Sequence, residues 1–261
     1  MRSIKIFVLL SLLAAPIVVK AQEDSFIIPE GAQYSILPNN DNVGRVICLH
    51  PDGGVWLASG NTLQCNNKTI ELPSRIKTRS LCGTNANNLV LFSNDTIFLL
   101  DNSQTLRPLV FVEARDIIIQ PFGKSKFTFC AFGDSVIYSY DIETDHMQAV
   151  VHYSKPIRDF IVDQEDIYLA VENNVVAFLR EKQYVPIFHN TNPIICIAFC
   201  GDQAILFSDK EGLWVIDRNR NKYAISNQPI LDIVTDSKAL GFFKTTNGDW
   251  LFVSQILNYT K

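Results

Sequence analysis

The chain has 261 residues, of which 47% are hydrophobic, 11% aromatic and only 19% charged. A chain this apolar can bury a sizeable core, which excludes a disordered or low-complexity protein. Its length suits either two ordinary domains or one large all-β or α/β domain.

Residues 1–21 are expected to be a secretory signal peptide. Two basic residues, Arg2 and Lys5, precede an apolar run over 6–19, and Val19-Lys20-Ala21 fits a cleavage point. The run is short for a membrane span, although an uncleaved membrane anchor is the alternative. No later segment approaches about 18 uninterrupted apolar residues. We therefore expect residues 22–261 to form a single exported, soluble domain with no transmembrane segment.

Export leaves an acidic protein. Cleavage after Ala21 removes three of the 23 basic residues and none of the 27 acidic ones, so the formal net charge of −4 becomes −7. A protein with this charge has no general attraction for phosphate backbones. We therefore expect no nucleic-acid partner.

Beyond the leader, short runs of β-branched and aromatic residues alternate with Asn, Asp, Gly and Pro, which predicts strands and turns. Six segments repeat one order: a strand, a polar turn, a second strand, a tight turn and a third strand. Their second strands begin roughly 40 residues apart. These strands begin at Gly54, Asn88, Phe127, Asp166, Gln203 and Lys238. Each tight turn carries the Gly, Asn or Asp that a hairpin with positive φ requires.

An outer strand follows most of these hairpins, as in TIELPS at 69–74 and YVPIFH at 184–189. Four antiparallel strands in roughly 40 residues are the blade of a β-propeller. The sixth unit ends without a convincing outer strand, whereas an orphan strand, AQYSILP at 32–38, precedes the first unit. We predict an all-β, six-bladed β-propeller whose ring is closed by this N-terminal strand, which leaves no open edge. Two β-sandwiches, or seven blades with one degenerate unit, are the alternatives.

Alignment of the six first strands places charged residues at two neighbouring positions. One position holds arginine in the first four units, namely Arg45, Arg79, Arg115 and Arg158, and Ile195 and Leu231 in the last two. The next position includes three aspartates, Asp116, Asp159 and Asp232. Because the first strand of a blade lines the central channel, these residues are expected at one channel mouth. The hairpins between second and third strands are expected on the same face.

Two interpretations of these charges remain open. Arginines at a channel mouth are suited to bind a carboxylate, sulfate or phosphate through bidentate hydrogen bonds. Alternatively, arginine and aspartate of neighbouring blades pair with each other and stabilise the ring. In either case the arginines are expected to keep the aspartates ionised, which argues against acid catalysis by them.

No catalytic, cofactor or metal motif is found: G-x-S-x-G, H-E-x-x-H and a phosphate loop are all missing. We therefore expect no cofactor and no metal. The six cysteines are Cys48, Cys65, Cys82, Cys130, Cys196 and Cys200. All but Cys65 lie in apolar strands, which favours buried free thiols, with disulfides as the alternative in an oxidising compartment. The three tryptophans, Trp56, Trp214 and Trp250, are expected to pack between blades, with a carbohydrate platform as the alternative.

Two segments, DGGVWLAS at 52–59 and DKEGLWVID at 209–217, resemble the D-x-x-G-x-L-W repeats of periplasmic two-component-regulator propellers, and Trp250 lies in a partial third copy. The leader ending in KAQ resembles Bacteroidetes usage. DTI at 95–97 and DSV at 134–136 resemble the O-glycosylation acceptor of that phylum, which would make Thr96 and Ser135 acceptors; ordinary turn residues are the alternative. The resemblance implies an exported bacterial six-bladed propeller in the periplasm, at the cell surface or outside the cell.

The sequence favours a non-catalytic binding or scaffold module that recognises a protein or glycan partner in the cell envelope through one face of the ring. The first alternative is a carbohydrate-active hydrolase or lyase, which would need two facing carboxylates at the channel mouth. The second is a structural component of an envelope assembly. Propellers carry many unrelated functions, so the fold does not choose among these three.

Overall fold

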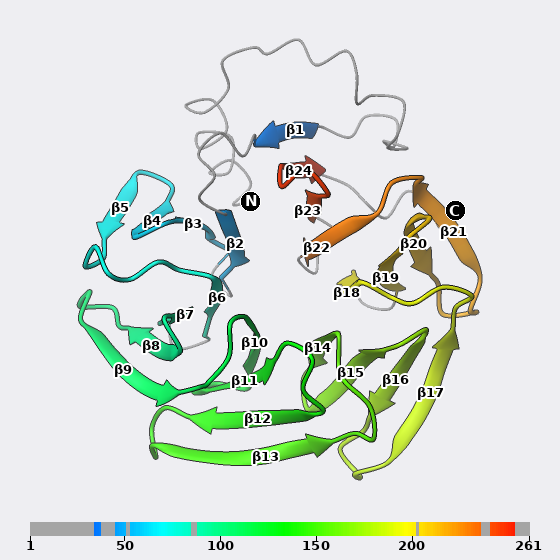
Figure 1. The fold of residues 1–261 in the computed structure, drawn as a ribbon, viewed down its shortest axis with the longest axis horizontal. Coiled ribbons are helices and arrows are strands. Elements are labelled where there is room, and N and C mark those ends of the chain that lie inside the picture. The colour runs from blue at the N-terminus through cyan, green and yellow to red at the C-terminus, as the bar shows by residue number, and fades with distance from the viewer. Residues whose placement is uncertain are drawn as a thin grey trace, which may run out of the picture.

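The computed structural model describes residues 34–37, 45–50, 53–84, 88–201, 204–235 and 241–253. The predicted signal peptide, residues 1–21, lies outside them. The described residues form six four-stranded antiparallel sheets arranged as the blades of a ring (Figure 1). In the part of the chain that the structure describes, no helix is long and apolar enough to cross a membrane.

The first three blades follow one another along the chain, each with its strands in sequence order from the inside of the ring outward. Blade 1 consists of β2 (Arg45–Leu49), β3 (Val55–Ser59), β4 (Thr62–Cys65) and β5 (Lys68–Glu71). Blade 2 consists of β6 (Ser80–Gly83), β7 (Leu89–Ser93), β8 (Thr96–Leu100) and β9 (Leu106–Phe111). Blade 3 consists of β10 (Ile117–Phe122), β11 (Lys126–Ala131), β12 (Val136–Asp141) and β13 (His146–His152).

The next two blades continue this order, and the last one combines both ends of the described chain. Blade 4 consists of β14 (Asp159–Asp163), β15 (Asp166–Val171), β16 (Asn174–Phe178) and β17 (Tyr184–His189). Blade 5 consists of β18 (Cys196–Cys200), β19 (Ala204–Asp209), β20 (Gly212–Ile216) and β21 (Lys222–Ser226). Blade 6 consists of β22 (Ile230–Thr235), β23 (Gly241–Thr245), β24 (Trp250–Val253) and β1 (Tyr34–Leu37).

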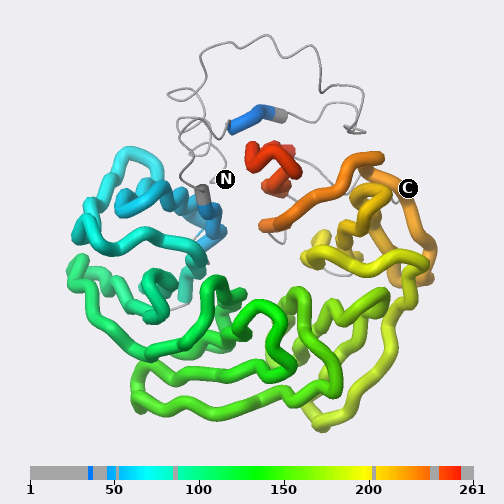
Figure 2. Tube along the Cα trace, viewed as in Figure 1, coloured from blue at the N-terminus to red at the C-terminus, as the bar shows by residue number. Residues whose placement is uncertain are grey.

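The ring closes as the sequence predicted. Strand β1 pairs antiparallel with β24, from Tyr34 opposite Val253 to Leu37 opposite Trp250 (Figure 2). The inner strands of neighbouring blades contact one another all the way round, including β22 of blade 6 with β2 of blade 1. Six four-stranded blades confirm the predicted propeller and exclude the two alternatives, two sandwiches and a seven-bladed ring.

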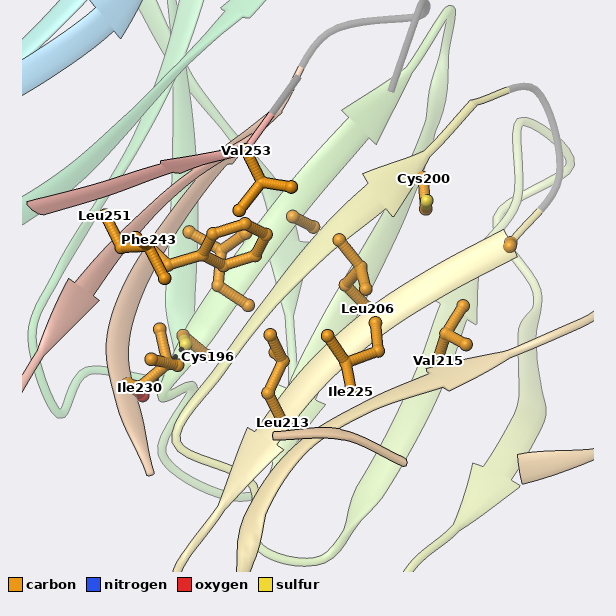
Figure 3. Packing of buried hydrophobic residues seen from close by; sticks show 13 residues of the cluster. Cys196, Cys200, Leu206, Leu213, Val215, Ile225, Ile230, Phe243, Leu251 and Val253 are labelled. Atoms are coloured by element: carbon orange, nitrogen blue, oxygen red, sulfur yellow. Dashed lines mark hydrogen bonds between the residues drawn. The ribbon is translucent and has the colours of Figure 1, made fainter. Parts of the chain in front are cut away.

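The hydrophobic core is divided among the six interfaces between blades. Each of the six buried clusters combines residues of two neighbouring blades. Figure 3 shows the cluster between blades 5 and 6, to which Leu213 of blade 5 and Phe243 of blade 6 both belong. Burial on both faces of a sheet explains why the inner and middle strands are apolar over most of their length. It also accounts for the high hydrophobic content of the chain.

The tryptophans and cysteines lie in this core. Trp250 is buried between blades 6 and 1, and Trp56 and Trp214 pack against the clusters between blades 1 and 2 and blades 4 and 5. The prediction that these rings pack between blades is therefore confirmed. All six cysteines are buried, including Cys65, which the sequence did not place in an apolar strand, and among the described residues none forms a disulfide.

The two segments that resemble D-x-x-G-x-L-W repeats occupy turns that are not equivalent. Residues 52–59 lead into β3, the second strand of its blade, whereas residues 209–217 lead into β20, a third strand. Trp250 also begins a third strand, β24. The shared residue pattern therefore describes a turn followed by a tryptophan that packs against the core, and it does not mark one position in the blade.

In the second of these segments, the motif residues are structural. The fully buried Asp209 carboxylate accepts hydrogen bonds from the backbone N–H groups of Glu211 (2.8 Å) and Gly212 (3.1 Å) and from the Trp214 indole (3.0 Å). Asn190 of blade 4 also donates to it, at 2.7 Å. A Cβ on Gly212 would lie 2.0 Å from the Ser226 carbonyl oxygen, so only glycine fits there.

Candidate functional site

A channel of about 900 Å³ runs through the ring and is lined by the inner strands of all six blades. We call the face on which the inner strands begin the N-face. Each second strand runs antiparallel to its inner strand, as in the pairing of Arg45 with Ser59 and of Ile117 with Ala131. The hairpins between second and third strands therefore lie on the N-face, as predicted.

Only some of the four aligned arginines line the channel. Arg79 and Arg158 line the channel, whereas the Arg115 side chain is 91% exposed and is not among the lining residues. Arg45 begins β2, but its side chain lies outside the described part of the structure. The predicted set of four arginines thus reduces to two described channel-lining side chains, one on blade 2 and one on blade 4.

Asp116 takes part in the pairing that the second interpretation of the charges predicted. Its carboxylate lies 3.8 Å from Nη1 of Arg79 and 4.0 Å from Nε of Arg115, and all three side chains are largely exposed. Arg79 also donates a hydrogen bond of 2.7 Å to the Arg115 carbonyl. Exposed ion pairs contribute roughly 0–1 kcal/mol. This cluster therefore orients Arg79 across the boundary between blades 2 and 3 but adds little stability.

Arg158 is different. None of the described acidic residues lies within ion-pair distance of its guanidinium, although Asp159 is its neighbour in the chain. The Asp159 carboxyl instead accepts hydrogen bonds from two backbone N–H groups, those of Phe160 and of Ile197 in blade 5, both at 2.8 Å. Arg158 is therefore an exposed, uncompensated cation at the channel mouth.

The expectation that the arginines keep all three aspartates ionised is wrong for Asp159. Burial raises the pKa of Asp159 to about 8, because it outweighs the hydrogen bond from Ile197, and the nearby Asp232 carboxylate adds to the rise. Burial also raises the pKa of Asp232, against the opposing charge of Lys244. The cause is desolvation in the channel wall, which a sequence alignment does not reveal.

The aspartate position has a structural role that the sequence did not suggest. The same aligned position holds Ser80 in blade 2 and Cys196 in blade 5. Side chains at this position in three blades form hydrogen bonds with the backbone of the next blade. The Ser80 hydroxyl donates to the Ile117 carbonyl, Asp159 accepts from Ile197, and the Cys196 thiol donates to the Ile230 carbonyl at 3.4 Å. These bonds join blades 2 and 3, 4 and 5, and 5 and 6. Short polar side chains at this position therefore stabilise the ring from inside the channel.

Three residues of the site were not predicted. Phe132 and Leu231 line the channel at the N-face with 67% and 46% of their surface exposed, and Lys244 lines it beside Asp232. Leu231 is presented by an irregularity in β22, where the pairing with β23 skips from Ile230 to Asp232. The replacement of arginine by leucine in the alignment was the available signal for Leu231, whereas Phe132 gave none.

The suggested glycosylation acceptors lie at equivalent places on the N-face. Thr96 follows the hairpin between β7 and β8, and Ser135 follows the hairpin between β11 and β12. Both residues are half-buried. Their modification stays a prediction.

The two aspartates with raised pKa values are separated by one blade. Asp159 and Asp232 lie on β14 and β22, with β18 and the buried Cys196 between them. In the described ranges, no three His, Cys, Asp or Glu side chains gather in a way that could hold a metal ion. What the mouth does present is two cations, Arg79 and Arg158, together with exposed apolar side chains.

Comparison with known proteins supports the fold alone. No family model matches the chain, and no curated protein matches it. A catalytically inactive virginiamycin B lyase from Staphylococcus aureus, solved with quinupristin, is similar with a TM-score of 0.61 and 11% identity, over 86% of this chain and 100% of the lyase.

Two further structures show the same architecture. The extracellular domain of a protein described as a one-component system of Bacteroides thetaiotaomicron has a TM-score of 0.59 and 14% identity, over 80% of this chain and 32% of that one. U3-55K has a TM-score of 0.60 and 10% identity, over 82% of this chain and 78% of U3-55K. An enzyme, an extracellular domain and U3-55K thus share one fold, so the function has to be argued from the site.

Proposed function

We propose that this protein is an exported, non-catalytic binding module that recognises a protein or glycan partner of the cell envelope through its N-face. The observation that carries this proposal is the exposure of Phe132 and Leu231 at the same channel mouth that Arg79 and Arg158 line. Exposed apolar side chains that gather on one surface mark interaction sites, and arginine is enriched among the residues that dominate binding energy. The leader pattern and the extracellular Bacteroides domain of the same fold support export.

A hydrolase or lyase acting on an exported carbohydrate is the second candidate, because one observation favours it. A carboxyl with a pKa of about 8, such as that of Asp159, is protonated at neutral pH and suits general acid catalysis. Against it, both Asp159 oxygens already accept backbone hydrogen bonds. Turnover of an envelope polysaccharide that Asp159→Asn abolishes would favour the enzyme.

Capture experiments test the binding module. The mature protein, immobilised and exposed to envelope extract, should retain a specific partner, and the double variant Phe132→Ser, Leu231→Ser should retain at least about tenfold less, as expected for hot-spot residues. The matched control is Phe111→Ser, Met147→Ser, which removes two equally exposed apolar side chains from the outer strands β9 and β13. Equal retention by both double variants, with unchanged thermal midpoints, would refute recognition through the N-face.

A further inference from the structure

The rim of the channel on the N-face is divided into two chemically different halves. At the position where each inner strand begins, blades 2 and 4 place Arg79 and Arg158 on the channel, whereas blades 5 and 6 place Ile195 and Leu231 there. Figure 1 shows blades 2 to 4 along the left and bottom of the ring and blades 5 and 6 along its right and top. The two arginines therefore belong to one side of the mouth and the two aliphatic residues to the other.

Charge compensation differs between the two cations. Arg79 shares Asp116 with Arg115, but Arg158 has no acidic partner within ion-pair distance among the described residues. Its nearest acid in the chain, Asp159, is turned to the backbone of blade 5. A guanidinium that is neither paired nor buried against a carboxylate is available for an external anion.

The space behind the rim suits a small molecule. The channel volume of about 900 Å³ lies within the range of small-ligand pockets, although its lining is more polar than that of a typical one. Its wall combines buried aliphatic side chains, such as Ile117 and Ile197, with the groups at the rim. A ligand that fills this mouth therefore meets positive charge on one side and hydrocarbon on the other.

We propose that the N-face mouth of the channel binds a small amphipathic anion, whose carboxylate, sulfonate or phosphate lies on Arg158 and Arg79 and whose apolar part packs against Leu231 and Ile195. This inference rests on the proposed function because both use the same channel mouth. It differs in the occupant, which is a small ligand here and a protein or glycan there. Phe132, between the two arginines on blade 3, adds an aromatic surface beside the anionic group.

Binding of such an anion should depend on pH through Asp159. Three titratable groups interact with this carboxyl: Cys130 on β11, Cys196 on β18 and Asp232 on β22. Arg158 is its neighbour in the chain, and Lys244 on β23 lies opposite Asp232. The pKa of Asp159 is about 8, so the carboxyl is neutral below that pH and negative above it. A negative Asp159 adds negative charge to the channel wall and repels the ligand, so affinity for an anion should fall as the pH rises from about 7 to about 9.

The test uses the fluorescent probe anilinonaphthalene sulfonate and its uncharged analogue phenylnaphthylamine, titrated into the mature protein. The sulfonate should bind more tightly than the analogue. Arg158→Gln should weaken the sulfonate about tenfold, the loss expected for one charge-assisted hydrogen bond, and leave the analogue unchanged. Leu231→Ser should weaken both probes. Arg180→Gln is the matched control, because Arg180 is paired with Glu165 at 2.6 Å in the turn after β16, on the opposite face.

Equal binding of the two probes by the wild type, or an unchanged sulfonate affinity in Arg158→Gln, would overturn the proposal. Circular dichroism of each variant excludes the trivial case in which the probe binds a partly unfolded chain. The outcome is separable from that of the proposed function. Loss of the captured partner in Phe132→Ser, Leu231→Ser without any preference for the sulfonate would refute the anion site alone, and the reverse result would refute the partner face alone.

Discussion

The stability of the wild-type protein should fall as the pH rises from about 5 to about 8, and Asp159→Asn should remove much of that dependence. The folded-state pKa of Asp159, about 8, lies above the ordinary value of 3.8 because the carboxyl is desolvated in the channel wall. Between these two values the folded protein holds a proton that the unfolded chain releases. Raising the pH therefore favours unfolding, by at most about 1.4 kcal/mol per pH unit.

Urea denaturation of both proteins at several pH values measures this difference. The side chain is half-buried, so water in the channel should reduce the slope below the limit for a fully buried carboxyl. Asp217→Asn is the control. A side-chain hydrogen bond from Asn221 lowers the pKa of Asp217, so the titration of this residue changes stability only in the acid range. A wild-type stability that rises from pH 5 to pH 8 relative to Asp159→Asn would contradict the assignment.

Asp209→Ala should cost about 3 kcal/mol or more of stability, the largest loss we expect from a single polar side chain in this protein. The substitution leaves the buried N–H groups of Gly212 and Trp214 without their acceptor. The substitution also removes the carboxylate that lies 4.0 Å from the Lys222 ammonium. That ammonium lies 3.8 Å from the centre of the Trp214 ring. Thermal denaturation followed by circular dichroism, together with Trp214 fluorescence, measures the loss.

The contribution of Asp209 to stability should change with pH only in the acid range. Burial opposes its ionisation, but the hydrogen bonds from Trp214 and Asn190 outweigh burial, so its pKa is lowered. A carboxyl with a lowered folded-state pKa stabilises the protein above about pH 4, and this contribution is lost as the pH falls through the folded value. Asp217→Ala, in an exposed turn of similar design, should lose much less. Equal losses in the two variants would show that the buried network is not what stabilises blade 5.

The propeller could be predicted because its signals are local and repeated. Each blade needs alternating strands and a turn residue that tolerates positive φ, as at Asn94 and Gly133, and six copies reinforce one another. Closure by the N-terminal strand could be predicted because the last unit lacks an outer strand and the first unit is preceded by an extra one. The D-x-x-G-x-L-W likeness was less informative, because a turn followed by a tryptophan that packs between blades occurs before a second strand as well as before a third.

The site could be predicted only as a set of positions. Alignment of the inner strands found Arg79, Arg158 and Asp159, since strand register is determined by local pattern. Side-chain direction was not accessible in the same way: Arg115 extends into solvent, and Leu231 is exposed by an irregularity in strand pairing. The pKa of Asp159 depends on desolvation by residues distant in sequence. Such quantities arise only when the ring is closed.

Site-specific photo-crosslinking is the measurement that tests recognition through the N-face most directly. A photoreactive phenylalanine analogue placed at Phe132 or at Leu231, in the full-length protein expressed in its own cells, should give a crosslink to the same specific partner from both positions. The same analogue at Phe111, which is 72% exposed on the outer strand β9, should give none. Crosslinks from Phe111 alone would contradict the account, because the partner would then lie on the rim of the ring and not at the channel mouth.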